Sequence, residues 1–162
     1  MCQLTPTHVF IHGLESTSRG TKGVFFRKRY PEMIIEDFSG SFQERMEKLG
    51  NLLAGKPDLI LVGSSYGGLM AAVYACRHEE QVKKLILLAP ALHLDPFKPY
   101  LSSKLQVPVT IFHGLRDQVV PITSVRKISE QVFLDCAFNT LDDDHVLHGT
   151  FAGFAWDSLL NL

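Results

Sequence analysis

Five short stretches of aliphatic and β-branched residues recur along the chain, and each ends at a glycine, a proline or a polar turn. Most of them are continuously apolar and do not alternate with polar residues, which is typical of strands covered on both faces of a sheet. The pattern predicts strands at residues 8–12, 33–38, 59–63, 85–89 and 109–113, with a weaker sixth at 137–141.

Helical patterns fill the gaps between these strands. Ser41 and Glu44 form the S-x-x-E pattern of a capping box, and an apolar stripe follows as far as Gly55, a residue that favours a helix end. Further helices are expected after Pro121 and over residues 21–30, 66–79 and 150–160. Alternating strands and helices predict an α/β fold, with a mainly parallel sheet of about six strands and helices on both faces. The length suits a single domain over residues 1–162.

A candidate nucleophile lies between the third strand and the helix that follows it. Residues 63–67 read GSSYG, a G-x-S-x-G pattern centred on Ser65. A sharp turn from strand to helix leaves no room for side chains two residues before and after the serine, so both positions favour glycine. Only Ser65 has a glycine at both places, whereas Ser64 does not. The alternative is a glycine-rich turn with no catalytic role.

A serine hydroxyl needs a neutral imidazole to remove its proton and a carboxylate to orient that imidazole. Asp117 follows the strand at 109–113 and precedes a helix that begins near Pro121, so it is the candidate carboxylate. An aspartate in this place could instead cap a turn or a helix. Asp95, which follows the preceding strand, is the second choice.

The candidate base lies after the weak sixth strand. His145 follows three aspartates on a loop before the last predicted helix, and His148, three residues on, is its rival. We prefer His145 because it is nearer the strand end, although a polar surface loop would look similar. The remaining histidines have weaker contexts, and His12 and His113, each before a glycine at a strand end, are interpreted as structural.

An oxyanion hole would need two backbone N–H groups beside Ser65. Residues 12–16, HGLES, follow the first strand, and their glycine lets the chain turn so that the next N–H faces the site. We assign the two donors to the backbone N–H groups of Leu14 and Tyr66. An ordinary strand-to-helix turn is the alternative.

Together these segments resemble the α/β-hydrolase superfamily over essentially the whole chain. The matching pieces are HGLES, GSSYGG, LLAPAL, HGLRDQVVP and DDDH. Within the superfamily the chain is similar to short bacterial esterases with little or no cap domain. The resemblance implies a reduced sheet of about six strands, triad roles for Ser65, Asp117 and His145, and hydrolysis of a carboxylic ester or thioester without a cofactor.

The same resemblance bears on substrate binding. Residues 91–107, where larger relatives insert a helical lid, form only a short connection here. We therefore expect a shallow, open pocket with Leu92, Phe97 and Tyr100 as its walls. The expected substrate is a small molecule with a small or medium acyl group. The alternative function is a ligand-binding or protein-interaction module that has the same fold and little turnover.

Composition and charge exclude several other classes. A net charge of −1 favours neither nucleic acid nor an anionic membrane as a partner, and no apolar run approaches the roughly 18 residues of a membrane span. The one basic cluster is either a solvated helix face or a site for an anionic part of a substrate. Its members are Lys22, Arg27, Lys28 and Arg29.

The cysteines and histidines carry no metal-binding pattern. Cys2, Cys76 and Cys136 are far apart and form no C-x-x-C pair, which favours reduced thiols in a cytoplasmic protein. No H-x-H or H-E-x-x-H motif is present, so neither a metal nor another cofactor is expected.

Overall fold

One six-stranded sheet forms the centre of the molecule in the computed structural model, which describes residues 5–161. The strand order is β2-β1-β3-β4-β5-β6, and every neighbouring pair is parallel. The strands are β1 (Thr7–Ile11), β2 (Ile34–Ile35), β3 (Leu59–Ser64), β4 (Val82–Leu88), β5 (Val109–Gly114) and β6 (Cys136–Leu141). The predicted α/β class and the six strands are confirmed.

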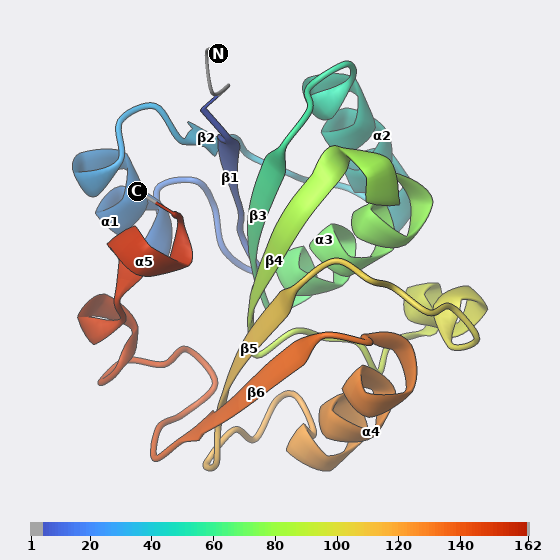
Figure 1. The fold of residues 1–162 in the computed structure, drawn as a ribbon. Helices are drawn as coiled ribbons and strands as arrows, with labels where there is room; N and C mark the ends of the chain where they lie inside the picture. The colour runs from blue at the N-terminus through green and yellow to red at the C-terminus, as the bar shows by residue number, and fades with distance from the viewer. Residues whose placement is uncertain (1–4, 162) are drawn as a thin grey trace.

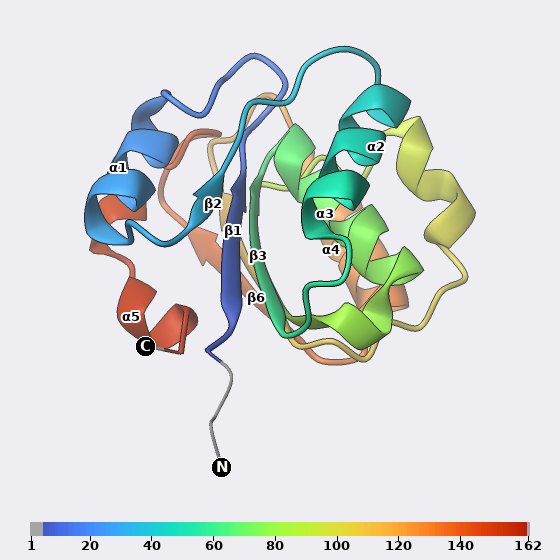
Figure 2. The ribbon, with the colours of Figure 1, turned by 90° about the horizontal axis from the view of Figure 1, so that it is seen from above.

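Helices cover both faces of the sheet, as Figures 1 and 2 show. One face carries α2 (Phe42–Leu53), α3 (Tyr66–Arg77) and α4 (Ile122–Val132), and the other carries α1 (Thr21–Arg29) and α5 (Trp156–Leu159). Short 3₁₀ helices span Glu79–Gln81, Asp95–Tyr100 and Phe151–Gly153. The capping box at Ser41 and Glu44 is formed, with both reciprocal hydrogen bonds present.

The two hydrophobic clusters explain why the central strands are apolar without interruption. In β3, Leu59 and Leu61 face the cluster under α2, α3 and α4, whereas Ile60 and Val62 face the cluster under α1 and α5. Side chains of a strand alternate between the two faces, so a sheet that is covered on both sides needs apolar residues at every position.

The helix predicted over residues 150–160 is wrong, because this segment forms a 3₁₀ turn, an extended break and the short α5. Phe151 and Trp156 are both buried against the sheet. Five residues apart on one helix, they would point about 140° away from each other. The break at Phe154, where ψ is 150°, lets both enter the core, and the Trp156 Nε1–H donates to the Phe151 carbonyl at 2.9 Å.

The order of the strands places a crevice above β1 and β3. The chain leaves β1 toward β2 on one side and later adds β3 on the other side. In open parallel sheets, ligands bind where the connections diverge in this way, at the carboxyl ends of the strands. The loop after β1 and the turn after β3 therefore meet at the edge where the candidate residues were expected.

Two further observations concern the cysteine thiols and the possibility of a membrane-spanning helix. Cys76 and Cys136 are half-buried free thiols, and desolvation raises the pKa of each to about 11, so both stay protonated at neutral pH. Cys2 lies outside the described residues. No helix within residues 5–161 has the length and hydrophobicity needed to cross a membrane. The cytoplasmic location stays a prediction.

Candidate active site

Ser65 stands on a strained turn between β3 and α3. Its backbone has a φ of 54° and a ψ of −112°, a conformation that an L-residue adopts at a cost. The turn is held because the Ser65 N–H donates to the Leu88 carbonyl at 2.8 Å. A Cβ at Gly63 would meet the Gly67 carbonyl oxygen, and one at Gly67 would meet the carbonyl oxygens at the end of β1. Both glycines of the motif are therefore required by the packing of the backbone.

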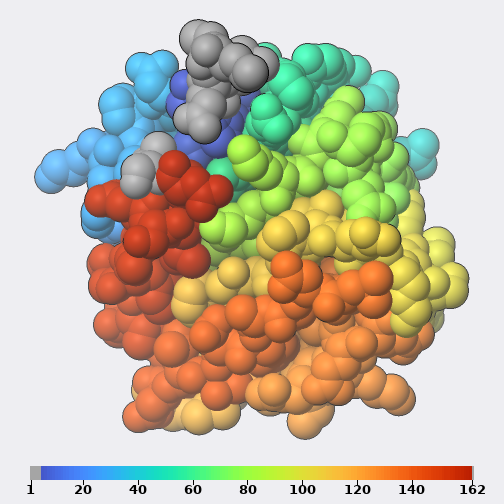
Figure 3. All heavy atoms as spheres, viewed as in Figure 1, coloured from blue at the N-terminus to red at the C-terminus, as the bar shows by residue number. Residues whose placement is uncertain are grey.

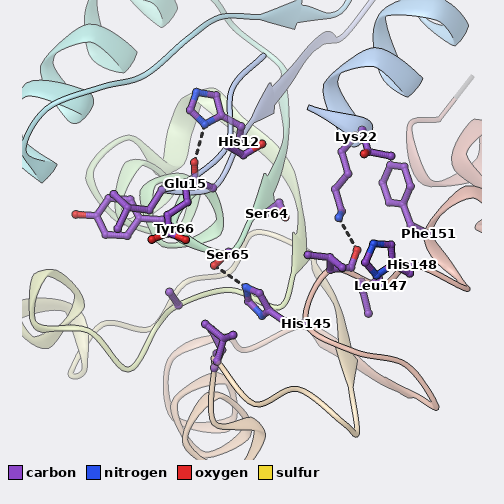
Figure 4. A pocket seen from close by; sticks show the side chains of 18 of the residues that line it. His12, Glu15, Lys22, Ser64, Ser65, Tyr66, His145, Leu147, His148 and Phe151 are labelled. Carbon is purple, nitrogen blue, oxygen red and sulfur yellow. Dashed lines mark hydrogen bonds between the residues drawn. The ribbon is translucent and has the colours of Figure 1, made fainter. Parts of the chain in front are cut away.

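His145 lies between the other two predicted residues. Its Nδ1 lies 2.7 Å from the Asp117 carboxylate, and its Nε2 lies 3.1 Å from the Ser65 hydroxyl. Because a carboxylate only accepts, Nδ1 carries the proton, and Nε2 is left with the lone pair that accepts from the hydroxyl. Figure 4 shows the imidazole pointing at Ser65, with a dashed line for the hydrogen bond between them. The structure thus brings Ser65, His145 and Asp117 together.

Asp117 is fixed by the turn that follows β5. Its side chain is fully buried, and its Oδ1 accepts the backbone N–H groups of Val119 and Val120, each at 2.8 Å. Oδ2 is left to face His145. The capping role that was the alternative interpretation of Asp117 is therefore present, but it uses only one carboxylate oxygen and leaves the other for the imidazole.

The rival residues lie elsewhere. His148 has a side chain that is 76% exposed and is paired with Asp144 at 2.8 Å, so it lies at the rim of the site and makes no bond to Ser65. Asp95 is also exposed and pairs with Lys98. The position of a residue in its loop, not its chemical type, separates His145 from His148.

The two predicted oxyanion donors flank Ser65. A Cβ at Gly13 would lie 3.5 Å from the Ser65 Cβ, so the loop after β1 packs directly against the elbow. Within residues 5–161, neither the Leu14 N–H nor the Tyr66 N–H donates to a protein acceptor. The Tyr66 N–H lies in the first turn of α3, where unpaired N–H groups carry partial positive charge.

His12 orients the peptide between Gly13 and Leu14. Its Nε2 accepts from the Phe38 N–H at 2.9 Å, so its Nδ1 carries the proton and donates to the Gly13 carbonyl at 2.7 Å. The C=O and N–H of a trans peptide point in opposite directions. With the Gly13 carbonyl held by His12, the Leu14 N–H faces the other way. The structural role predicted for His12 is therefore a specific one.

The comparisons with known proteins now decide the family. The model of the α/β-hydrolase fold family matches residues 15–102, which is more than half of the chain. The chain belongs to this family. A curated mouse protein, (lyso)-N-acylphosphatidylethanolamine lipase, is 34% identical over 82 residues. The match covers 51% of this hydrolase-fold chain and 22% of the mouse protein, so the aligned part spans about a fifth of the length of that relative.

Solved structures of other α/β-hydrolase proteins share the fold. Est1E from Butyrivibrio proteoclasticus aligns over 96% of this chain and 86% of its own, with a TM-score of 0.77 and 20% identity. Mouse alpha/beta hydrolase domain-containing protein 10 aligns over 92% and 85%, with a TM-score of 0.75 and 21% identity. A monoacylglycerol lipase from Paleococcus ferrophilus aligns over 96% of each chain, with a TM-score of 0.73 and 15% identity.

A cavity of about 680 Å³ opens at Ser65 and His145 of this α/β-hydrolase chain. This volume lies within the range of small-molecule sites. Part of its lining comes from β1, α1 and the segment after His145, and includes Phe10, Thr21, Lys22, Phe25, Leu147 and Phe151. The lining also includes residues of the loop after β1 and of other loops around Ser65, among them Leu14, Glu15, Tyr66, Leu94 and Val119.

The walls expected from the sequence are not the walls of this cavity. Leu92 and Phe97 are fully buried in the core cluster that packs under α3, and Tyr100 accepts a hydrogen bond from Arg77 at 2.6 Å on the same side. None of the three lines the cavity. Residues 95–100 fold back onto α3 as a 3₁₀ helix, so only the start of the 91–107 segment, at Ala91, His93 and Leu94, lines the cavity, together with α1 and the C-terminal segment.

The loop that carries His145 is held by Asp143. This buried carboxylate accepts from the Asp144 N–H at 2.8 Å, the Gly149 N–H at 3.0 Å, and both the N–H and the hydroxyl of Thr150 at 2.9 and 2.7 Å. Desolvation alone would raise the pKa of Asp143, but the bonds from Thr150 and its neighbours outweigh it and hold this pKa below its usual value. Sequence reasoning missed this role because three aspartates stand in a row.

His113 lies beside Asp117 in the interior. It is fully buried, its Nδ1 donates to the Gly114 carbonyl at 3.1 Å, and the same nitrogen lies 3.8 Å from the Asp117 carboxylate. Desolvation lowers the pKa of His113, so the ring is neutral at neutral pH. It adds a neutral, polar wall behind the carboxylate.

Proposed function

We propose that this chain is a serine hydrolase that cleaves a carboxylic ester or thioester through an acyl-enzyme intermediate. The observation that carries the proposal is the position of His145, whose two ring nitrogens bond to Asp117 on one side and to Ser65 on the other. This arrangement gives the hydroxyl a base in the correct tautomer. The names of two relatives, each a lipase, agree with an ester of an acyl group as the substrate class.

The reaction would begin when the Ser65 oxygen attacks the carbonyl carbon and its proton passes to the Nε2 of His145. Asp117 stabilises the imidazolium that forms, and the N–H groups of Leu14 and Tyr66 donate to the oxyanion. The tetrahedral intermediate then collapses, and the proton on Nε2 passes to the departing alcohol or thiol.

Water completes the cycle. It attacks the acyl carbon while His145 takes one of its protons, and the second tetrahedral intermediate releases the carboxylic acid and returns the proton to Ser65. Each step uses groups that the described residues supply. The strained backbone at Ser65 presents its hydroxyl to the His145 Nε2, and the loop after β1 packs directly against the same turn.

Covalent labelling tests the proposal directly. A fluorophosphonate probe should label the purified wild-type chain, because the activated hydroxyl attacks phosphorus as it would attack a carbonyl carbon. Ser65→Ala should lose labelling and should also lose turnover of 4-nitrophenyl butyrate by at least about a thousandfold. Ser64→Ala, one residue earlier, is the matched control and should still be labelled.

His145→Gln adds a second arm to the experiment, since it removes the base and leaves the serine in place. Labelling should slow by at least about a hundredfold, while His148→Gln should label at close to the wild-type rate. If wild type is not labelled and turns over no ester, the chain is not a serine hydrolase. A binding module with the same fold would then be the better interpretation.

A further inference from the structure

The sequence left the role of the basic cluster open, and the fold gives its four residues different surroundings. Arg27 donates to the Ser18 carbonyl at 3.1 Å, and Arg29 pairs with Asp157 at 3.1 Å on the outside of the molecule. Lys28 is exposed on α1. Lys22 alone of the four turns toward the candidate active site, and within residues 5–161 it is the one lysine or arginine that lines the cavity.

Lys22 is a half-buried cation against an apolar wall. Its Nζ lies 5.1 Å from the centre of the Phe151 ring and donates to the Val146 carbonyl at 2.5 Å. Figure 4 shows the side chain reaching from α1 toward the loop of His145, beside Phe151. An ammonium group has three N–H donors, so this one bond leaves two of them for another acceptor.

No carboxylate among residues 5–161 forms an ion pair with Lys22. The nearest acidic charges, Asp143 and Asp144, have their oxygens occupied by the backbone near Thr150 and by His148. Desolvation outweighs their influence and lowers the pKa of Lys22. A partly desolvated charge with unused donors is unfavourable until an anion joins it.

We propose that Lys22 binds an anionic group of the substrate, a carboxylate or a phosphate. This group stands at the end of an apolar chain of the substrate, away from the ester. This inference rests on the proposed function, since it assigns the substrate class of the same site. The apolar chain of the substrate lies between α1 and the C-terminal segment, against Phe25, Leu147 and Phe151, while its ester carbonyl lies at Ser65. Among the described residues that line the cavity, Glu15 is the one carboxylate, and it is exposed on the loop after β1.

The test compares charged and neutral esters of equal carbon count. On the acyl side the pair is mono-4-nitrophenyl adipate and 4-nitrophenyl hexanoate, and on the leaving-group side it is 4-acetoxybenzoate and 4-methylphenyl acetate. Phosphate is tested separately with 4-acetoxyphenyl phosphate, which carries the acetyl ester and the phosphate on opposite oxygens of one ring, against the neutral phenyl acetate. For each pair the ratio of kcat/KM, charged over neutral, is measured after subtraction of spontaneous hydrolysis.

Lys22→Met keeps the length of the aliphatic part of the lysine side chain and removes the charge. In at least one pair this variant should lower the charged-over-neutral ratio by roughly tenfold or more, the effect of losing one charge-assisted hydrogen bond. Lys22→Arg should keep most of the ratio. Lys28→Met, which removes a charge from the same helix outside the cavity, should leave it unchanged. Intrinsic differences in ester reactivity cancel, because each ratio is compared between variants.

Two results would overturn the proposal. A ratio that is the same in wild type and Lys22→Met for all pairs would show that the ammonium meets no substrate anion. If the ratio is unchanged because kcat/KM falls equally on charged and neutral esters, Lys22 only holds the His145 loop through Val146. In both cases hydrolysis of neutral esters by wild type leaves the serine hydrolase intact, whereas absence of both turnover and fluorophosphonate labelling removes both proposals.

Discussion

Replacing Asp143 with asparagine tests whether one buried carboxylate positions the base. The side chain is 5% exposed and accepts four hydrogen bonds, three on Oδ2 and one on Oδ1. In its best orientation asparagine keeps an oxygen at Oδ2, and its NH₂ then faces the Asp144 N–H. One bond to a charged acceptor is lost, which costs about 1.5–3 kcal/mol. The other three change from charge-assisted to neutral bonds, so the expected total loss is about 3 kcal/mol or more.

Urea unfolding at neutral pH measures this loss, and Trp156, the single tryptophan of the chain, reports it by fluorescence. Asp143→Asn should lower the free energy of unfolding by about 3 kcal/mol, and kcat/KM should fall by roughly tenfold or more as His145 loses its fixed position. The stabilisation should be present above the ordinary aspartate pKa. It should fade as the pH falls through the lower pKa that Asp143 has in the folded state.

Asp142→Asn is the matched control. Asp142 is the preceding residue, its side chain is 88% exposed, and it pairs with Arg116 at the surface. An exposed ion pair of this kind is worth little, so the variant should stay within about 0.5 kcal/mol of wild type. If Asp143→Asn also stays within that margin, or if both variants lose the same amount, the four hydrogen bonds do not position the loop.

Two smaller perturbations address the elbow and the buried histidine. The free energy of unfolding of Ser65→Gly should exceed that of Ser65→Ala by about 1 kcal/mol, because glycine accepts the positive φ without strain. Equal urea midpoints for the two variants would contradict the strain. His113→Phe should lose less melting temperature between pH 7 and pH 5 than wild type. Burial holds the folded-state pKa of His113 below its unfolded value of about 6.5, so wild type loses stability as the pH falls below that value. Equal drops in melting temperature for wild type and His113→Phe would argue against this effect of His113.

The elements that the sequence predicted well are those that depend on local sterics or on whether each face of the sheet is covered. The apolar runs at β3 and β5 had to be strands between two covered faces, and Gly63 and Gly67 had to flank Ser65 because the backbone passes too close for a Cβ. The residue before β2 illustrates the limit of such reasoning. Met33 was placed in a strand of six residues, but β2 contains only Ile34 and Ile35, which pair with Val9 and Phe10 of β1.

The cavity could not be predicted in the same way because its walls come from distant parts of the chain. Phe25 of α1 and Phe151 of the C-terminal segment contact each other with ring centres 4.9 Å apart, and more than a hundred residues separate them. Their meeting depends on the extended break near Phe154, which the apolar pattern over residues 150–160 concealed. Leu92, Phe97 and Tyr100 looked suitable as walls from their residue types, but their place under α3 is a property of tertiary packing.

The loop around His145 shows how a short polar sequence becomes a rigid support for chemistry. Asp143 fixes its polar side, and Leu147 fixes its apolar side, because this leucine is fully buried although its φ is 57°. A leucine keeps such a conformation only when packing compensates for the strain, so the core under α1 determines where the loop runs. Lys22 adds a third anchor at Val146. The imidazole is therefore positioned from three sides without a cap domain, and two of these anchors, Lys22 and Leu147, also line the cavity. If the proposed substrate site is correct, the same contacts that position the base also face the substrate.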